Sequence, residues 1–180
     1  MTILKIDSSI TGENSVSRVL TRSIVDQLRA GDPTAQLIER DLVNQPLDHL
    51  TLAAFADSSV LDEFLAADTV VVGAPMYNFN ISSQLKSWID RIAVAGKTFR
   101  YTESGPEGLA GAKRVIIAMS RGGFYEDGNR LEHVEAYLKP MFNFLGIEPE
   151  FVRADGIALG PDQREASLAS GLTEVERLAA

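Results

Sequence analysis

A segment rich in hydroxyl side chains near the N-terminus has the composition of an anion-binding site. It runs from Ser8 to Ser17 and reads Ser-Ser-Ile-Thr-Gly-Glu-Asn-Ser-Val-Ser, immediately before an expected helix. A helix N-terminus offers unpaired backbone N–H groups and the positive end of the helix dipole, and serine hydroxyls add donors without bulk. The segment lacks both the P-loop and the G-x-G-x-x-G patterns. It therefore favours a monophosphate such as that of FMN over a triphosphate, with helix capping as the alternative.

Arg18 follows this segment directly. From the sequence, it either adds positive charge to the anion site or is a solvated surface residue.

A second segment combines two aromatic residues with a methionine directly after a buried strand. It runs from Ala74 to Ser82 and reads Ala-Pro-Met-Tyr-Asn-Phe-Asn-Ile-Ser. Apolar rings and a thioether can pack against the faces of a flat aromatic cofactor, while Asn78 offers a donor and an acceptor to its edge. The alternatives are a hydrophobic plug over the end of the sheet and a dimer contact.

A third segment places paired glycines directly after another strand. It reads Ser-Arg-Gly-Gly-Phe-Tyr from Ser120 to Tyr125. Glycine permits a positive φ and close approach of the backbone to a ligand. Backbone N–H groups freed there can bond the oxygen and nitrogen atoms of the pyrimidine edge of a flavin, although an ordinary turn would have the same composition.

The elements that must position these segments alternate regularly along the chain. Five runs rich in β-branched residues predict strands and five amphipathic runs predict helices. The strands cover 2–7, 35–40, 69–73, 114–120 and 150–154, and the helices 16–28, 61–65, 81–92, 134–145 and 168–175. This alternation predicts a parallel sheet covered on both faces. We expect one domain over residues 1–180, a flavodoxin-like three-layer α/β/α sandwich with five parallel strands in the order 2-1-3-4-5.

The predicted fold also says where a ligand binds. In open α/β sheets the site lies beyond the carboxyl ends of the strands, where the strand order reverses. Here that rim consists of the loops 8–17, 74–80 and 120–127, which contain the three unusual segments. The charged residues of the last helix, by contrast, are expected to form a solvated face.

Composition excludes several classes of function. The 180 residues include 17 Lys and Arg against 25 Asp and Glu, a formal charge of −8, so neither nucleic acid nor an anionic membrane is an expected partner. The absence of cysteine excludes disulfides and thiolate chemistry. His49 and His133 form no metal-binding pattern, so no metal site is expected. With no signal-peptide pattern and no bilayer-spanning run, the expected location is the cytoplasm.

Three motifs together carry a resemblance to a known family. They are Ala-Pro-Met-Tyr-Asn-Phe-Asn-Ile-Ser at 74–82, Thr-Phe-Arg-Tyr-Thr-Glu-Ser-Gly-Pro-Glu-Gly-Leu at 98–109 and Ser-Arg-Gly-Gly at 120–123. In order and spacing, from Ile3 to about Gly160, the chain resembles the bacterial FMN-dependent azoreductases, also called FMN-dependent NADH:quinone oxidoreductases.

The resemblance implies a role for each motif. It implies that the FMN phosphate is held by Ser9, Ser15, Val16 and Ser17, one side of the isoalloxazine by Met76, Tyr77, Asn78 and Phe79, and the other side with the pyrimidine end by Ser120, Arg121, Gly122 and Gly123. It also implies a homodimer with the active site at the subunit interface. The residues Phe99, Tyr101 and Phe144 match walls of the substrate pocket, some of them from the partner chain, and Tyr125 is placed there too, where some relatives have His.

The same resemblance implies the chemistry. NADH or NADPH would reduce FMN at N5, and a quinone or azo compound would then take the hydride in the same site, which requires ping-pong kinetics. No side chain is expected to be catalytic. The segment 46–59 is shorter than in better-known members, and Pro140 should kink its helix or delay the start of that helix. The alternative functions are an FMN electron carrier without a nicotinamide pocket, which the aromatic residues of 98–109 argue against, and a flavin-free domain of the same fold.

Overall fold

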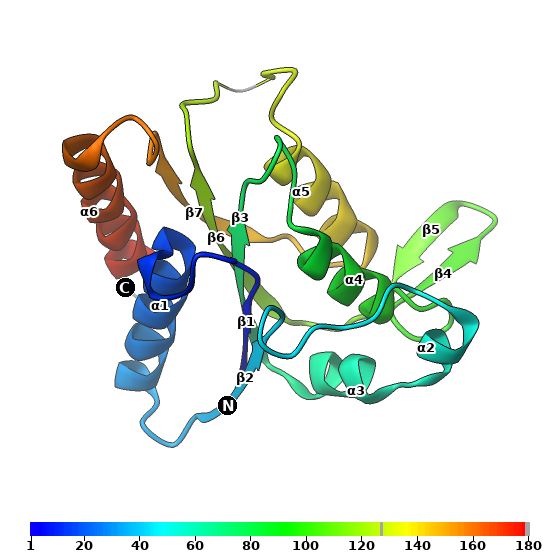
Figure 1. Ribbon diagram of the computed structural model, residues 1–180. Helices are drawn as coiled ribbons and strands as arrows, with labels where there is room; N and C mark the ends of the chain where they lie inside the picture. The colour runs from blue at the N-terminus through cyan, green and yellow to red at the C-terminus, as the bar shows by residue number, and fades with distance from the viewer. Residues whose placement is uncertain (127, 179–180) are drawn as a thin grey trace.

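A five-stranded parallel sheet forms the centre of the computed structural model, which describes residues 1–126 and 128–178 (Figure 1). The strands are β1 (Thr2–Asp7), β2 (Gln36–Asp41), β3 (Thr69–Pro75), β6 (Arg114–Arg121) and β7 (Glu150–Asp155). Their order is β2-β1-β3-β6-β7, which confirms the predicted order 2-1-3-4-5. Asp127 of the third predicted loop, and residues 179–180 of the expected domain, lie outside the described residues.

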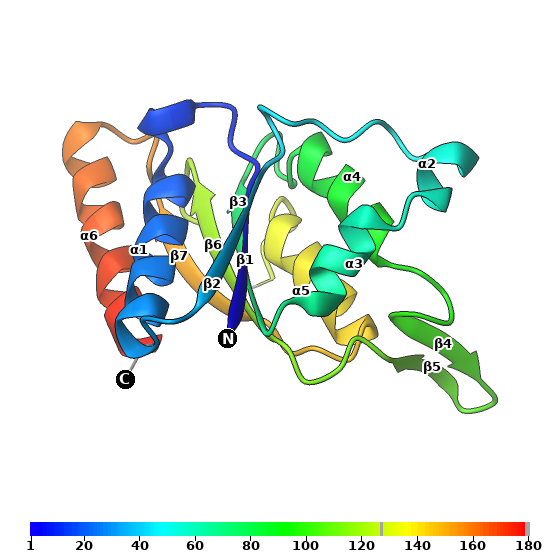
Figure 2. The same cartoon turned by 90° about the horizontal axis from the view of Figure 1, so that it is seen from below.

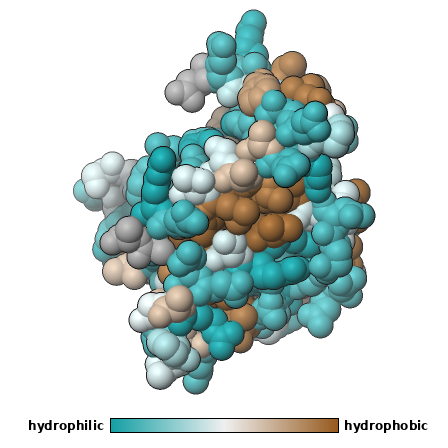
Figure 3. All heavy atoms as spheres, turned by 90° about the vertical axis from the view of Figure 1, so that its left-hand side faces the viewer, coloured by the Kyte–Doolittle hydropathy of each residue, from teal (hydrophilic) through white to brown (hydrophobic). Residues whose placement is uncertain are grey.

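Helices cover both faces of the sheet. The helices α1 (Val16–Gly31) and α6 (Pro161–Leu178) lie on one face, and α3 (Ser59–Ala66), α4 (Ser83–Ile92) and α5 (Val134–Phe144) lie on the other (Figures 1 and 2). Because side chains alternate across a strand, Val70 and Val72 of β3 belong to the core beneath α3 to α5, while Val71 belongs to the core beneath α1 and α6. From the α1 and α6 side, the surface is mostly hydrophilic with an apolar patch near its centre (Figure 3).

Four short elements were not predicted from the sequence. They are the 3-10 turn η1 (Gly12–Asn14), the helix α2 (Leu52–Ala56) and a hairpin of β4 (Phe99–Thr102) with β5 (Gly105–Gly108). The strand β5 reads Gly-Pro-Glu-Gly, a composition typical of a turn, so its pairing depends on β4 and not on its own propensity. Within the shortened segment 46–59, the buried Arg91 of α4 donates to the carbonyl oxygens of Ala54 at 3.1 Å and Asp48 at 3.0 Å and so holds α2 in place.

Pro140 does not delay the start of α5, which was one of the two effects expected from the sequence. The helix begins at Val134 and continues through Pro140 to Phe144. The missing N–H of Pro140 leaves the carbonyl of Ala136 without a helical partner, and both residues are exposed. Water can therefore satisfy that carbonyl. In the described ranges 1–126 and 128–178, no helix has the length and apolar character needed to cross a membrane.

The β4–β5 hairpin is mounted on the end of α5 by close backbone contact. The amide of Ala110 donates to the carbonyl of Leu145 at 3.2 Å, and a Cβ on Gly108 would lie 2.1 Å from the nitrogen of Gly146. The buried Thr98 joins the hairpin to α4, since its hydroxyl donates to the carbonyl of Ile92 at 2.6 Å. The position of the hairpin therefore depends on Gly108, because any larger residue there would force the backbone at Gly146 to move.

Replacing Gly108 tests this placement. Gly108→Ala is expected to lower the free energy of unfolding by about 3 kcal/mol, because overpacking against rigid backbone lies at the upper end of such penalties. Urea unfolding measures the change. Gly31→Ala is the matched control, since its added Cβ would meet no atom within 4 Å, and it should leave stability unchanged or slightly higher. Equal stability of both variants would mean that the hairpin does not sit where the structure has it.

Candidate functional site

The three predicted loops meet at one cavity of about 450 Å³ at the carboxyl rim of the sheet. A volume in the range of roughly 300–1,000 Å³ is typical of sites for cofactors and small molecules. Its lining comes from all three loops, from the connection between β7 and α6 and from the first turn of α6, namely Ser9, Thr11, Asn14, Ser15, Val16, Pro75, Met76, Tyr77, Ser120, Gly122, Ile157, Ala158 and Arg164. Seven of the predicted cofactor residues are therefore brought together in a single cavity.

The N-terminus of α1 provides the hydrogen-bond donors at one end of this cavity. Ser15 caps the helix, because its hydroxyl accepts from the amide of Arg18 at 3.2 Å, and it lies 3.1 Å from the hydroxyl of Ser17. The amides of Val16 and Ser17 donate to no acceptor in the described part of the chain. The two interpretations of this segment, helix capping and anion binding, are therefore compatible. Ser15 caps the helix, and the same turn leaves two buried amides available to an anion.

Arg18 has neither of the two roles considered from the sequence. Its guanidinium bonds the carboxylate of Asp41 at 2.7 and 3.0 Å and the carbonyl of Ser9 at 2.9 Å, and only 12% of its side chain is exposed. Its charge is therefore used within the protein. It connects the backbone of Ser9 to Asp41 of β2 and so holds the hydroxyl-rich loop in position without entering the cavity.

This ion pair predicts a pH dependence of stability. The bonds from Arg18 lower the pKa of Asp41 from 3.8 to about 2. A lowered folded-state pKa stabilises the native state fully above the unfolded value, and this contribution disappears as the pH falls through about 2. Asp41→Asn is therefore expected to cost about 2 kcal/mol at neutral pH and progressively less as the pH falls below 4. Urea unfolding across this range measures the difference from the unmodified chain.

Glu13→Gln serves as the control for Asp41→Asn, because Glu13 forms an exposed ion pair with Arg22 beside the same loop. Exposed pairs contribute little, so this variant should match the unmodified chain at every pH. A constant difference for Asp41→Asn from pH 7 to pH 2 would contradict the assignment.

The second loop forms a tight turn that is tied to the first. Two hydrogen bonds between Tyr77 and Asn80, of 2.8 and 3.0 Å, close the turn, and Asn78 and Phe79 between them have φ values of 48° and 68°. Left-handed backbone is tolerated by asparagine but strained for phenylalanine, and such strain concentrates at functional sites. The hydroxyl of Tyr77 accepts from the amide of Ile10 at 3.0 Å and lies 3.2 Å from the hydroxyl of Ser9. Tyr77 therefore locks the two loops together. Asn78 and Phe79 are exposed at the rim and do not line the cavity.

The third loop is held by its arginine. The buried Arg121 bonds the carboxylate of Asp155 at 2.6 and 2.5 Å, and Glu132 lies 3.7 Å from it. Its side chain lines a neighbouring cavity of about 430 Å³, where the ring of Tyr125 lies 5.5 Å from the guanidinium carbon. Arg121 thus faces away from the main cavity, and Tyr125 does not line that cavity either.

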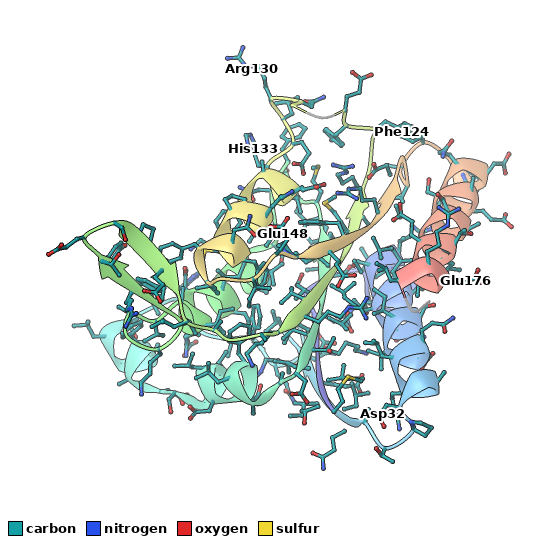
Figure 4. The ribbon with its side chains drawn as sticks, turned by 180° about the vertical axis from the view of Figure 1, so that it is seen from behind. Asp32, Phe124, Arg130, His133, Glu148 and Glu176 are labelled. Atoms are coloured by element: carbon teal, nitrogen blue, oxygen red, sulfur yellow. The ribbon has the colours of Figure 1, made fainter. Side chains whose placement is uncertain are left out.

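The paired glycines follow this anchored arginine. The carbonyl of Gly122 accepts from the amide of Ala158 at 3.0 Å, whereas the amides of Gly122 and Gly123 donate to no acceptor among residues 1–126 and 128–178. Two backbone donors therefore remain available at this edge. Phe124 and His133 lie at the same rim, on the segment between β6 and α5 (Figure 4).

The three aromatic residues predicted for the substrate pocket lie together but outside the main cavity. The ring centroids of Phe99 and Phe144 are 4.4 Å apart, and Tyr101 is 5.6 Å from Phe99. Tyr101 is 75% exposed. This aromatic cluster, Phe99, Tyr101 and Phe144, sits where the hairpin meets α5 and does not line the cavity of its own chain.

Comparison with known proteins identifies the family of this chain. The model of the flavodoxin-like fold family matches residues 1–179. An FMN-dependent NADH:quinone oxidoreductase of Sinorhizobium fredii is 55% identical over 94% of this chain and 92% of its own, and FMN-dependent NADH:quinone oxidoreductase 2 of Bradyrhizobium diazoefficiens is 52% identical over the whole of both. This chain belongs to the flavodoxin-like family that includes these oxidoreductases.

Solved structures of the family share the architecture. An azoreductase from Bacillus anthracis has a TM-score of 0.89 and 28% identity over 99% of this chain and 98% of its own. An FMN-dependent NADH-azoreductase from the same species, solved in complex with FMN, has a TM-score of 0.86 and 27% identity over 99% of this chain and 98% of its own. The resemblance noted in the sequence is therefore confirmed at the level of the family.

Part of the cavity of this flavodoxin-like protein was missed in the sequence. The connection between β7 and α6 contributes Ile157 and Ala158, and the first turn of α6 contributes Arg164. In this fold, ligands bind at the carboxyl ends of the strands, where the strand order reverses. The segment 156–161, Gly-Ile-Ala-Leu-Gly-Pro, was overlooked because it contains no aromatic or hydroxyl side chain. The expectation of a solvated last helix was also wrong in part, because Arg164 faces the cavity and Glu174 accepts from the amide of Arg153 at 2.9 Å.

Proposed function

We propose that this protein is an FMN-dependent NADH:quinone oxidoreductase that also reduces azo compounds. The observation that carries the proposal is the meeting of three loops at one cavity on the carboxyl rim, with available backbone amides in the first and the third loop. The relatives named as FMN-dependent NADH:quinone oxidoreductases and the azoreductase structures support it. We also propose that residues 1–180 act as one FMN-binding domain.

The donor chemistry of the cavity fits FMN. Hydroxyl groups and free amides at Ser9, Ser15, Val16 and Ser17 suit a phosphate, and the thioether of Met76 and the ring of Tyr77 suit one side of a flat ring. Asn78 and Phe79 at the rim, with Ser120, Gly122 and Gly123 opposite, would hold the edge of that ring. Arg121 would act through the backbone it anchors, since its side chain is paired with Asp155.

The protein contributes position and electrostatics. Bound FMN would supply the hydride-transfer chemistry between NADH and a quinone or azo compound. The amides of Gly122 and Gly123 would stabilise negative charge at the pyrimidine edge. No side chain is assigned as a catalytic acid, base or nucleophile. Because donor and acceptor would use the same face, turnover should follow ping-pong kinetics.

A homodimer completes this proposal. The aromatic cluster lies away from the cavity of its own chain and includes the 75% exposed Tyr101. We propose that it walls the cavity of the partner subunit, where it would contact the substrate. A cytoplasmic location stays a prediction from the sequence.

Reduction by NADH tests the function against the alternative of an electron carrier. Under anaerobic conditions, the FMN-loaded protein should lose its yellow colour within seconds of adding NADH, as turnover numbers of enzymes imply. Double-reciprocal plots of NADH against a quinone should give parallel lines. A yellow protein that NADH leaves oxidised would be a carrier, and a chain that takes up no FMN would refute the proposal entirely.

Two variants control this experiment. Asn78→Gly removes the amide but keeps the left-handed backbone accessible, and it should weaken FMN binding by about three- to tenfold, the value of one hydrogen bond. His49→Ala alters an exposed residue and should leave binding and reduction unchanged.

Complementation between two defective chains tests the shared active site. Gly122→Trp would fill the cavity, since an added Cβ there meets only the Cβ of Ala158, at 3.3 Å, while Tyr101→Ala removes part of the aromatic cluster. Each homodimer should reduce quinones poorly. A heterodimer would contain one site with an intact cavity and an intact cluster, so it should recover about half the activity of the unmodified dimer, as one of two independent sites implies. No recovery in the heterodimer would show that the cluster does not serve the partner.

A further inference from the structure

Arg164 is placed unusually for a residue of a surface helix. It lies in the first turn of α6, where the helix dipole disfavours positive charge. Its side chain is half-buried, lines the main cavity and donates through Nη2 to the carbonyl of Asn14. Asn14 immediately precedes Ser15, the cap of α1. The guanidinium of Arg164 is therefore held beside the free amides at the N-terminus of α1.

The two arginines that anchor the first and the third loop have their charges neutralised within the protein. Arg18 is paired with Asp41, and Arg121 is paired with Asp155. In the described part of the chain, Arg164 forms no ion pair, and it is the only charged residue among those that line the cavity. The bond to the carbonyl of Asn14 leaves most of its five N–H donors available.

A positively charged group in the cavity would matter for phosphate binding because this protein is acidic. The chain carries a formal charge of −8, so the overall field opposes an anionic ligand. Hydroxyls and amides at the first loop supply hydrogen bonds but no net charge. A phosphate monoester carries a charge of roughly −1.5 to −2 at neutral pH, and a guanidinium can bond two of its oxygens at once.

We infer that Arg164 binds the phosphate of FMN and gives the site its preference for FMN over riboflavin. The inference rests on the proposed function, and it adds a contact from α6 to a phosphate site that the sequence placed entirely in the loop 8–17. Arg164 would reach the phosphate from the side of α6, opposite the hydroxyl groups of the loop, and would close that end of the cavity.

Flavin titrations of the apoprotein test the inference without measuring turnover. Arg164→Gln keeps a donor for the Asn14 carbonyl but removes the charge. It should raise the Kd for FMN by at least about tenfold, the loss of a charge-assisted bond, while the Kd for riboflavin changes by less than about twofold. Arg164→Lys, which restores the charge without the planar geometry, should recover part of the affinity for FMN. Quenching of flavin fluorescence measures both constants.

Arg22→Gln is the matched control, because it removes the same charge from an exposed residue paired with Glu13 of the same loop. It should leave both Kd values unchanged. If Arg164→Gln weakened the binding of FMN and riboflavin equally, Arg164 would only support η1. If neither Kd changed, Arg164 would not contact the ligand. Either result overturns the inference. If the unmodified apoprotein binds neither flavin, the proposed function fails with it, whereas tight binding of FMN by Arg164→Gln overturns the inference alone.

Discussion

The unpaired backbone amides at the carboxyl rim of the sheet are the constraint on which the rest of the site depends. Strand order reverses between β1 and β3, so the connections from these two strands leave to opposite faces and open a gap between them. At this rim the amides of Val16 and Ser17, in buried residues after β1, and those of the half-buried Gly122 and Gly123, after β6, have no acceptor in the described part of the chain. Buried donors without partners are costly, and a ligand rich in acceptors removes that cost.

The loops that present these amides are held by ion pairs placed behind them. Arg18 with Asp41 supports the first loop, and Arg121 with Asp155 supports the third. Both arginines have little exposed side-chain area, and removing one partner of such a pair leaves an uncompensated charge. The pairs therefore make the loops rigid while keeping their own charges out of the cavity. Tyr77 links the second loop to the first through its hydroxyl, so the rim behaves as one braced unit.

The sequence was informative wherever a pattern had one physical reading. The buried strands were predicted to within about two residues, because runs such as Val70-Val71-Val72 fit only a strand that is covered on both faces. The hairpin was missed because Gly-Pro-Glu-Gly has no strand propensity and pairs only in its tertiary setting. The directions of side chains could not be predicted either. The resemblance placed Arg121 at the cofactor, and the last helix with Arg164 was expected to be solvated, yet Arg121 faces away from the cavity and Arg164 lines it.

The separation of the cavity from the aromatic cluster supports the proposal that substrate recognition needs two chains. The cavity is polar at the end near α1, and Tyr77 is the one aromatic residue among the described residues that line it, whereas Phe99, Tyr101 and Phe144 gather where the hairpin joins α5. Contact of the exposed Tyr101 ring with water is unfavourable, and burial of that ring against another surface would lower the free energy. In a dimer with a two-fold axis, the aromatic cluster of each chain can pack against the cavity of the other chain. The same contact then forms twice, since a two-fold interface joins the same two surfaces in both directions. Cofactor binding would then belong to the single chain, and substrate binding to the pair.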